Sequence, residues 1–190
     1  MSRLPYSYVG VPLGKRAFAK VTVEVFVDFF CPFSAKCAPV LFQLAELEDV
    51  AVRVIPYPQP WHFEGGLIAT AFNTILRNEK TEAAVKYYAA LMKAYPKFAE
   101  EGKKMSADAI LKLAYALREG ISDMKEKDFM EGIHDHESPG VVRQLKNQIK
   151  YGRTNSIHET PTFKVNGLVT NASSSWDLAK WKEFLAPLLS

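Results

Sequence analysis

The chain has 190 residues, of which 48% are hydrophobic and 24% are charged, so it can bury a core and does not have a disordered composition. The net charge is only +3, and basic residues are interleaved with acidic ones, which argues against a dedicated nucleic-acid-binding surface. No apolar run approaches the roughly 20 residues that a membrane-spanning helix needs, so we expect no membrane insertion.

The first strong pattern is a strand that leads directly into a cysteine-containing turn. Valine alternates with other residues over 21–29, which predicts a mostly buried strand. The segment 35–48 then carries apolar residues at helical spacing. Pro32 suits the first position of that helix, where its missing N–H costs nothing. The pattern therefore predicts strand, tight turn and helix, with Cys31 at the turn.

The middle of the chain is predicted to be helical. A second strand is expected at 51–55, and the three prolines within 56–60 end it. From 63 to 150 apolar residues recur at helical spacing almost throughout. Ser106 is a good helix cap, and Ser138-Pro139 predicts the start of a further helix.

Strand character returns near the end of the chain. Residues 160–165 and 168–170 flank Asn166-Gly167, which is a strong hairpin signal. Because an isolated hairpin is marginally stable in water, we expect it to complete the same sheet as the two earlier strands. Residues 173–175 are the expected cap of a last amphipathic helix.

The position of Cys31 favours thiol chemistry. Backbone N–H groups at a helix N-terminus stabilise an anion, and the thiolate is the nucleophilic form of cysteine. The alternative interpretation is that Cys31 packs as a small, buried apolar residue.

The segment Asp28-Phe29-Phe30-Cys31-Pro32-Phe33-Ser34, followed by a helix, resembles the active-site turn of the DsbA-type oxidoreductases. The resemblance implies an α/β, thioredoxin-like fold with a large all-helical insertion where the prolines lead out of the sheet. It assigns 1–62 and 151–190 to a discontinuous thioredoxin-like domain and 63–150 to a helical insertion domain. Thr160-Pro161, ahead of the hairpin, resembles the cis-proline element that faces the active cysteine in that family.

The chain departs from the family's dithiol motif, because Ser34 stands where the second cysteine would be. Cys37 lies six positions after Cys31, a rise of about 9 Å along a helix, so the two cannot form a disulfide while the helix is intact. We expect Cys37 to be a helix-face or core thiol. The site is then predicted to use one cysteine, with Ser34 donating a hydrogen bond to its thiolate and an external thiol such as glutathione resolving mixed disulfides.

Four residues around the cysteine are predicted to bind substrate: Pro32, Phe33, Thr160 and Pro161. A cis peptide bond before Pro161 would leave the backbone of Thr160 free to pair with an extended peptide or with glutathione. His158 is a candidate to reach the site and supply a proton near neutral pH, and the Trp61-His62 pair are candidates for the cleft. The ordinary alternatives are a solvated loop histidine and packing between domains.

A second departure concerns the acid. Thioredoxin-fold oxidoreductases often carry a buried carboxylate six residues before the nucleophile, and that position is Val25 here. Glu24 and Asp28 lie on the other face of the strand if alternation holds. We expect Asp28 to interact with the turn rather than to act as a base.

The leading prediction is a DsbA-like thiol–disulfide oxidoreductase that acts on a thiol- or disulfide-containing peptide or small molecule. It would have no metal and no tightly bound cofactor, and glutathione is a candidate co-substrate. One alternative is a glutathione-dependent transferase or isomerase resembling the kappa-class transferases, and another is a non-catalytic peptide-binding module. Residues 1–6 lack the apolar segment of a secretory signal, so we expect a cytoplasmic protein, where reduction is favoured over oxidative folding.

Overall fold

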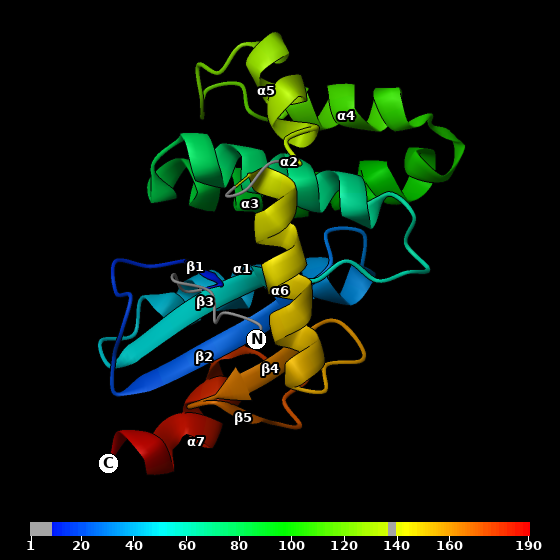
Figure 1. Ribbon diagram of the computed structural model, residues 1–190. Helices are drawn as coiled ribbons and strands as arrows, with labels where there is room; N and C mark the ends of the chain where they lie inside the picture. Colours follow the sequence, from blue (N-terminus) through cyan, green and yellow to red (C-terminus); the bar gives the residue numbers. More distant parts are fainter. Residues whose placement is uncertain (1–8, 137–139) are drawn as a thin grey trace.

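The central strand of the sheet is β2 (Val21–Val27), which pairs on both sides. It runs parallel to β3 (Val50–Pro56) and antiparallel to β4 (Thr162–Val165). In the computed structural model, which describes residues 9–136 and 140–190, the sheet order is β1-β3-β2-β4-β5 (Figure 1). The edge strands are β1 (Val11–Pro12), which the sequence analysis missed, and β5 (Leu168–Val169). Residues 1–6 and Ser138-Pro139, on which two expectations rest, lie outside the described residues.

β2 and β3 are connected through α1 (Pro32–Ala45), as the strand–turn–helix pattern predicts. The strand ends at Val27 rather than at 29, because Asp28 begins the turn. The N–H of Cys31 donates to the carbonyl of Asp28 at 3.0 Å. The N–H of Phe30 donates to the Asp28 carboxylate at 2.9 Å.

The hairpin between β4 and β5 has the turn that its sequence predicts. Asn166 and Gly167 have φ angles of 47° and 87°, in the left-handed region that asparagine and glycine tolerate best. The side-chain oxygen of Asn166 also accepts a hydrogen bond from the N–H of Thr22 at 2.8 Å. This contact holds the turn against the start of β2.

Five α-helices lie between β3 and β4 in the described residues: α2 (Gly65–Asn78), α3 (Thr81–Glu101), α4 (Ala107–Ala116), α5 (Glu126–Ile133) and α6 (Val141–Thr154). A short 3₁₀ helix, Gly102–Lys104, follows α3. α2 contacts each of the other four helices, and α6 runs from them down across the sheet (Figure 1). The predicted domain boundary at residue 150 therefore falls inside α6, and the division into two domains stays a prediction. No helix of the described residues is long and apolar enough to cross a membrane.

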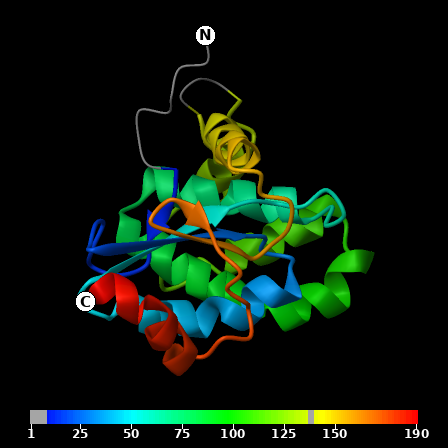
Figure 2. The same ribbon diagram turned by 90° about the horizontal axis from the view of Figure 1, so that it is seen from below.

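Helices cover both faces of the sheet. Seen from below, α6 lies on one side, and α1 and α7 (Leu178–Leu189) lie on the other (Figure 2). The expected cap of α7 at 173–175 was wrong, because the helix begins after Asp177. The Asp177 carboxylate accepts a hydrogen bond from the N–H of Lys180 at 2.8 Å, whereas the Ser173 hydroxyl accepts one from the N–H of Ser175 in a preceding turn.

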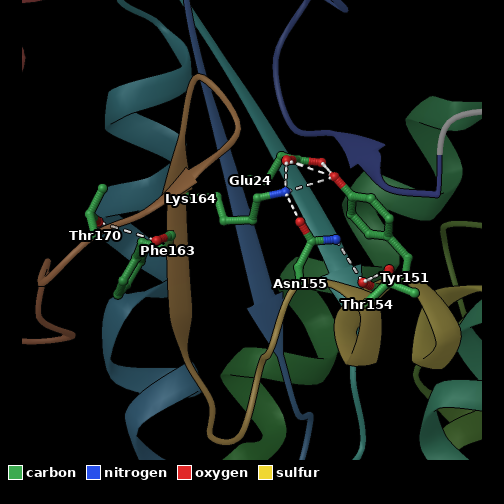
Figure 3. Close-up of polar contacts among 7 residues, drawn as sticks. All are labelled: Glu24, Tyr151, Thr154, Asn155, Phe163, Lys164 and Thr170. Carbon is green, nitrogen blue, oxygen red and sulfur yellow. Dashed lines mark hydrogen bonds and ion pairs between the residues drawn. The ribbon is translucent and has the colours of Figure 1, made fainter.

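A buried ionic cluster fastens α6 to the sheet (Figure 3). Lys164 of β4 is only 3% exposed, and its ammonium lies 3.2 Å from the carboxylate of Glu24 on β2. It also donates to the hydroxyl of Tyr151 at 3.0 Å and to the side-chain oxygen of Asn155 at 2.7 Å. The Tyr151 hydroxyl in turn donates to Glu24 at 2.8 Å. We call these four residues the Glu24 cluster.

Each charge of the Glu24 cluster has a partner, and the pKa of Lys164 reflects this. Burial lowers that pKa, but the hydrogen bond to Tyr151 and the attraction of Glu24 outweigh it, so the pKa lies above its ordinary value. The cluster joins β2 to α6 and β4, with Glu24 127 positions before Tyr151. Removing one of its charges would leave the other poorly compensated.

Candidate active site

Cys31 caps the N-terminus of α1, with Pro32 at the first helical position, as the sequence predicts. The residue is only 4% exposed. Its thiol donates a hydrogen bond to the carbonyl oxygen of Thr160, with Sγ and the oxygen 3.1 Å apart. The Thr160-Pro161 peptide bond is cis. The cysteine and the Thr-Pro pair that the sequence analysis expected to face each other therefore do so, although 129 positions separate Cys31 from Thr160.

The prediction that Ser34 donates a hydrogen bond to the sulfur of Cys31 was wrong. Ser34 is fully buried, and its hydroxyl accepts a hydrogen bond from the N–H of Asp28 at 3.2 Å. Among the described residues no hydrogen bond joins it to Cys31. The physical reason is that Asp28 lies just past the end of β2, so its N–H is free of the strand ladder and available to a side chain in the first turn of α1.

Cys37 is a core thiol, as expected. It is buried on α1, and its thiol donates to the carbonyl oxygen of Ser34 at 3.3 Å. Burial raises the pKa of the Cys37 thiol to about 12. Both cysteines are free, so Cys37 is neither a disulfide partner of Cys31 nor a good nucleophile in the folded protein.

The carboxylate of Asp28 is completely buried beside the cysteine turn. Its Oδ1 accepts from the N–H of Phe30, and its Oδ2 accepts from the N–H of Gln59 at 2.9 Å. Oδ2 also lies 2.7 Å from Nδ1 of His62. A Cβ atom at Gly65 would come within 2.7 Å of Oδ1, so this approach of α2 requires glycine. Asp28 does contact the turn, as expected, but its other partners were not foreseen.

The Asp28–His62 contact was missed because the alternation argument assumed a strand that continued to residue 29. Since β2 ends at Val27, Asp28 belongs to the turn and no longer follows the period-two pattern. The signal that the sequence did offer was His62 itself, which follows the proline-rich exit from β3. It was recognised as a cleft candidate but was not paired with a carboxylate.

A cleft of about 640 Å³ opens beside the cysteine turn. Its lining includes aromatic and polar side chains from three segments: Phe30, Pro32, Trp61, His62, Phe63 and Tyr95. Trp61 and Phe63 are 64% and 77% exposed, and Phe33 is exposed as well. Trp61 and His62 therefore do line a cleft, as the sequence analysis considered, and the cleft is largely apolar.

Tyr95 of α3 lies in the electrostatic field of the same site. Burial raises the pKa of its phenol, and negative charge on Cys31 and on Asp28 raises it further. At neutral pH the hydroxyl is protonated and can donate a hydrogen bond to a group in the cleft.

The remaining candidates lie around the Thr160 strand. Thr160 is buried, and its hydroxyl is a buried polar group that has no hydrogen-bond partner among residues 9–136 and 140–190. Pro161 is half-buried, and His158 is exposed. His158 lines a smaller pocket of about 310 Å³ that also includes Trp61 and Arg153. No hydrogen bond joins His158 to Cys31 in the described part of the chain.

Comparison with known proteins decides the family. The family model Thioredoxin_4, described as thioredoxin, matches residues 10–185. The chain belongs to this thioredoxin family. No match was found among curated protein sequences.

Solved structures with the same arrangement are similar to this thioredoxin-family chain over nearly all of its length. BdbD from Bacillus subtilis has a TM-score of 0.75 at 18% identity, with 95% of this chain and 93% of that chain covered. The catalytic domain of Proteus mirabilis ScsC has a TM-score of 0.70 at 17% identity, with coverage of 98% and 92%. A Pseudomonas syringae protein assigned as a protein-disulfide isomerase has a TM-score of 0.68 at 26% identity, with coverage of 93% and 97%. The predicted thioredoxin-like fold with a helical insertion is confirmed.

Proposed function

We propose that this protein is a thiol–disulfide oxidoreductase that reacts through Cys31 alone. The observation that carries the proposal is the placement of the Cys31 thiol at the start of α1, 3.1 Å from the carbonyl oxygen of Thr160. Membership of the thioredoxin family supports it, as does the similarity to the Pseudomonas syringae protein assigned as a protein-disulfide isomerase.

The first step is attack on a disulfide. The thiolate of Cys31 forms a bond to one sulfur of R–S–S–R′, the S–S bond breaks, and R′–S⁻ leaves with the electron pair. The product is a mixed disulfide between Cys31 and R, and the leaving thiolate takes up a proton. Cys31 stands at the N-terminal end of α1, where the helix dipole favours negative charge, and the exposed aromatic residues beside the turn provide an apolar surface for the substrate.

The second step requires a thiol from outside the chain. Cys37 does not resolve the mixed disulfide, because it is buried and protonated, and Ser34 carries no sulfur. A thiolate such as that of glutathione attacks the sulfur of R in the mixed disulfide. The bond to Cys31 breaks, Cys31 leaves as the thiolate, and a new disulfide forms between R and glutathione. We propose glutathione and a cytosolic setting together, because a reduced glutathione pool there would drive this step toward substrate reduction.

The test is mixed-disulfide formation, followed by intact-mass spectrometry. Reduced protein incubated with glutathione disulfide should gain one glutathione, and reduced glutathione should remove it. Cys31→Ser should gain none, whereas the matched control Cys37→Ser should behave as the wild type. Protection of Cys31 from alkylation by glutathione without an adduct would contradict this reaction and favour the transferase alternative. Neither an adduct nor protection would contradict both enzyme functions.

Restoring a second cysteine tests the site geometry independently. We expect Ser34→Cys to form an intramolecular disulfide with Cys31 on mild oxidation, because the two positions lie at the N-cap and within the first turn of α1. Thiol counting before and after reduction measures it. Two free thiols at positions 31 and 34 after oxidation would contradict the assigned turn.

A further inference from the structure

The buried carboxylate of Asp28 and the partly exposed imidazole of His62 form a pair that takes no part in the two exchange steps proposed for Cys31. Asp28 is completely buried, whereas the His62 side chain is 22% exposed and lines the cleft beside Pro32. The pair thus connects the interior of the cysteine turn with the place where a substrate bound to Cys31 would lie.

We propose that His62, oriented by Asp28, protonates the sulfur that leaves when Cys31 attacks a disulfide. This inference rests on the proposed function. His62 acts as the general acid of the exchange reaction and Asp28 is a positioning residue. The site then differs from a simple nucleophilic cysteine, because it also assists the leaving group.

The contacts of Asp28 fix the imidazole ring in a useful orientation. Nδ1 of His62 lies 2.7 Å from a carboxylate oxygen, so Nδ1 carries a proton and donates it in a hydrogen bond. No hydrogen bond from the other ring nitrogen, Nε2, is made to any described residue, and the ring lines the cleft. The backbone N–H groups of Phe30 and Gln59 donate hydrogen bonds to the Asp28 carboxylate and hold it in place.

Several charged or titratable groups face His62 from the surrounding elements. Asp28 contacts it from the cysteine turn, and Glu64 and Tyr95 line the same cleft from the start of α2 and from α3. Arg153 of α6 shares a second pocket with it, and Cys31 lies across the turn from Asp28.

The proton balance of the step is complete. The Cys31 thiol first loses its proton to solvent. As the thiolate attacks and the S–S bond breaks, protonated His62 gives its Nε2 proton to R′–S⁻, which leaves as R′–SH, and the neutral imidazole then takes up a proton from solvent. No oxidant or reductant other than the disulfide substrate is needed.

The experiment compares two disulfides with the variant His62→Gln. Glutathione disulfide releases a basic thiolate that benefits from protonation, whereas dithiobis(nitrobenzoate) releases a weakly basic one that leaves without help. At neutral pH, His62→Gln should react about 100-fold more slowly than the wild type with glutathione disulfide. With the aromatic disulfide, the decrease in rate relative to the wild type should be far smaller. Stopped-flow measurement of a single turnover gives both rates.

The matched control is His136→Gln, which changes an exposed histidine outside the site and should keep both wild-type rates. In His62→Ala, added imidazole should restore part of the rate of reaction with glutathione disulfide. If His62 had only a structural role, imidazole would not restore that rate. Equal losses with both disulfides, or no loss with either, would overturn the inference. If the wild type itself forms no adduct with glutathione disulfide, the proposed function fails instead, so the two failures are distinguishable.

Discussion

The structure contains two largely buried polar clusters that both include a carboxylate from the β2 region, and they differ in whether a partner of that carboxylate lines the cleft beside Cys31. In the Glu24 cluster, the carboxylate meets the ammonium of Lys164 and the hydroxyl of Tyr151 between the sheet and α6 (Figure 3). Asp28, four residues further on, meets two backbone N–H groups and an imidazole that opens onto a cleft.

This difference indicates a structural role for the Glu24 cluster and a chemical role for the Asp28–His62 pair. The Glu24 cluster is neutral in sum, and Lys164 at its centre is almost completely enclosed, so it holds α6 against the sheet. The Asp28–His62 pair has one member that reaches a substrate-sized space next to a nucleophile. A titratable pair with one member in a cleft beside a nucleophile is the better candidate for catalysis.

The largest stability effect should come from breaking the Glu24 cluster. Lys164→Met would leave the Glu24 carboxylate without its cation, and we expect the free energy of unfolding to fall by about 3 kcal/mol. The double variant Glu24→Gln/Lys164→Met should recover most of that loss, because no uncompensated charge remains. Chemical denaturation measures both. A single variant as stable as the wild type would contradict the structural role, and Cys31 reactivity should change little in either variant.

The same cluster makes a prediction about alkaline pH. Because the folded-state pKa of Lys164 is raised from 10.5, its stabilising contribution is complete below that pH and is lost as the pH rises through the folded value. The wild type should therefore lose stability more steeply above pH 10.5 than the double variant does. Parallel alkaline curves for the two proteins would show that the pair contributes nothing.

A smaller effect is expected from crowding the Asp28 carboxylate. In Gly65→Ala, the added Cβ would lie 2.7 Å from Oδ1 and would displace the carboxylate. We expect a loss of about 2 kcal/mol in stability, together with slower exchange with glutathione disulfide. Gly66→Ala is the matched control, because a Cβ there meets no atom within 4 Å. Equal behaviour of the two variants would mean that the position of Asp28 does not matter.

A smaller loss still is expected from Tyr151→Phe. It removes one hydroxyl that donates to Glu24 and accepts from Lys164 but leaves the ion pair in place, so it should cost about 1.5 kcal/mol. Thermal or chemical unfolding measures the loss. A loss as large as that of Lys164→Met would mean that the hydroxyl, and not the ion pair, holds α6 to the sheet.

The smallest reactivity is expected at the second cysteine, Cys37. With its pKa raised to about 12, Cys37 has very little thiolate near pH 8 and should resist alkylation in the native protein. Peptide mapping after a brief alkylation should find label on Cys31 and none on Cys37. Label on Cys37 at a comparable rate would contradict its assignment as a core thiol.

Most of the fold could be predicted from the sequence because its signals are local. The alternation over 21–29, the helical spacing after Pro32 and the Asn166-Gly167 turn each report on neighbouring residues, and each prediction was confirmed in kind. The two-residue strand β1 was missed, because its pairing with β3 is a long-range property. The cap of α7 was misplaced because several hydroxyl and carboxylate residues compete within 173–177.

The site could be predicted only in part. Cys31 and Thr160-Pro161 carry a recognisable pattern, and the structure brings them together. The partners of Ser34 and Asp28 depend on where β2 ends, because Asp28 lies beyond Val27 and no longer follows the alternation of the strand. The role of His62 depends on its contact with Asp28, which lies 34 positions earlier in the chain. No local sequence pattern predicts that contact.

The most direct test compares the reactivity of Cys31 in folded and unfolded protein. In reduced Cys37→Ala, the rate of glutathione-adduct formation at neutral pH would be measured in buffer and again in concentrated denaturant. We expect a faster reaction in the folded protein, although Cys31 is only 4% exposed, because the cleft beside the turn holds the disulfide next to the sulfur and His62 protonates the leaving thiolate. A folded protein that reacts more slowly than the unfolded chain would show that Cys31 is a packing residue and would contradict the proposed function.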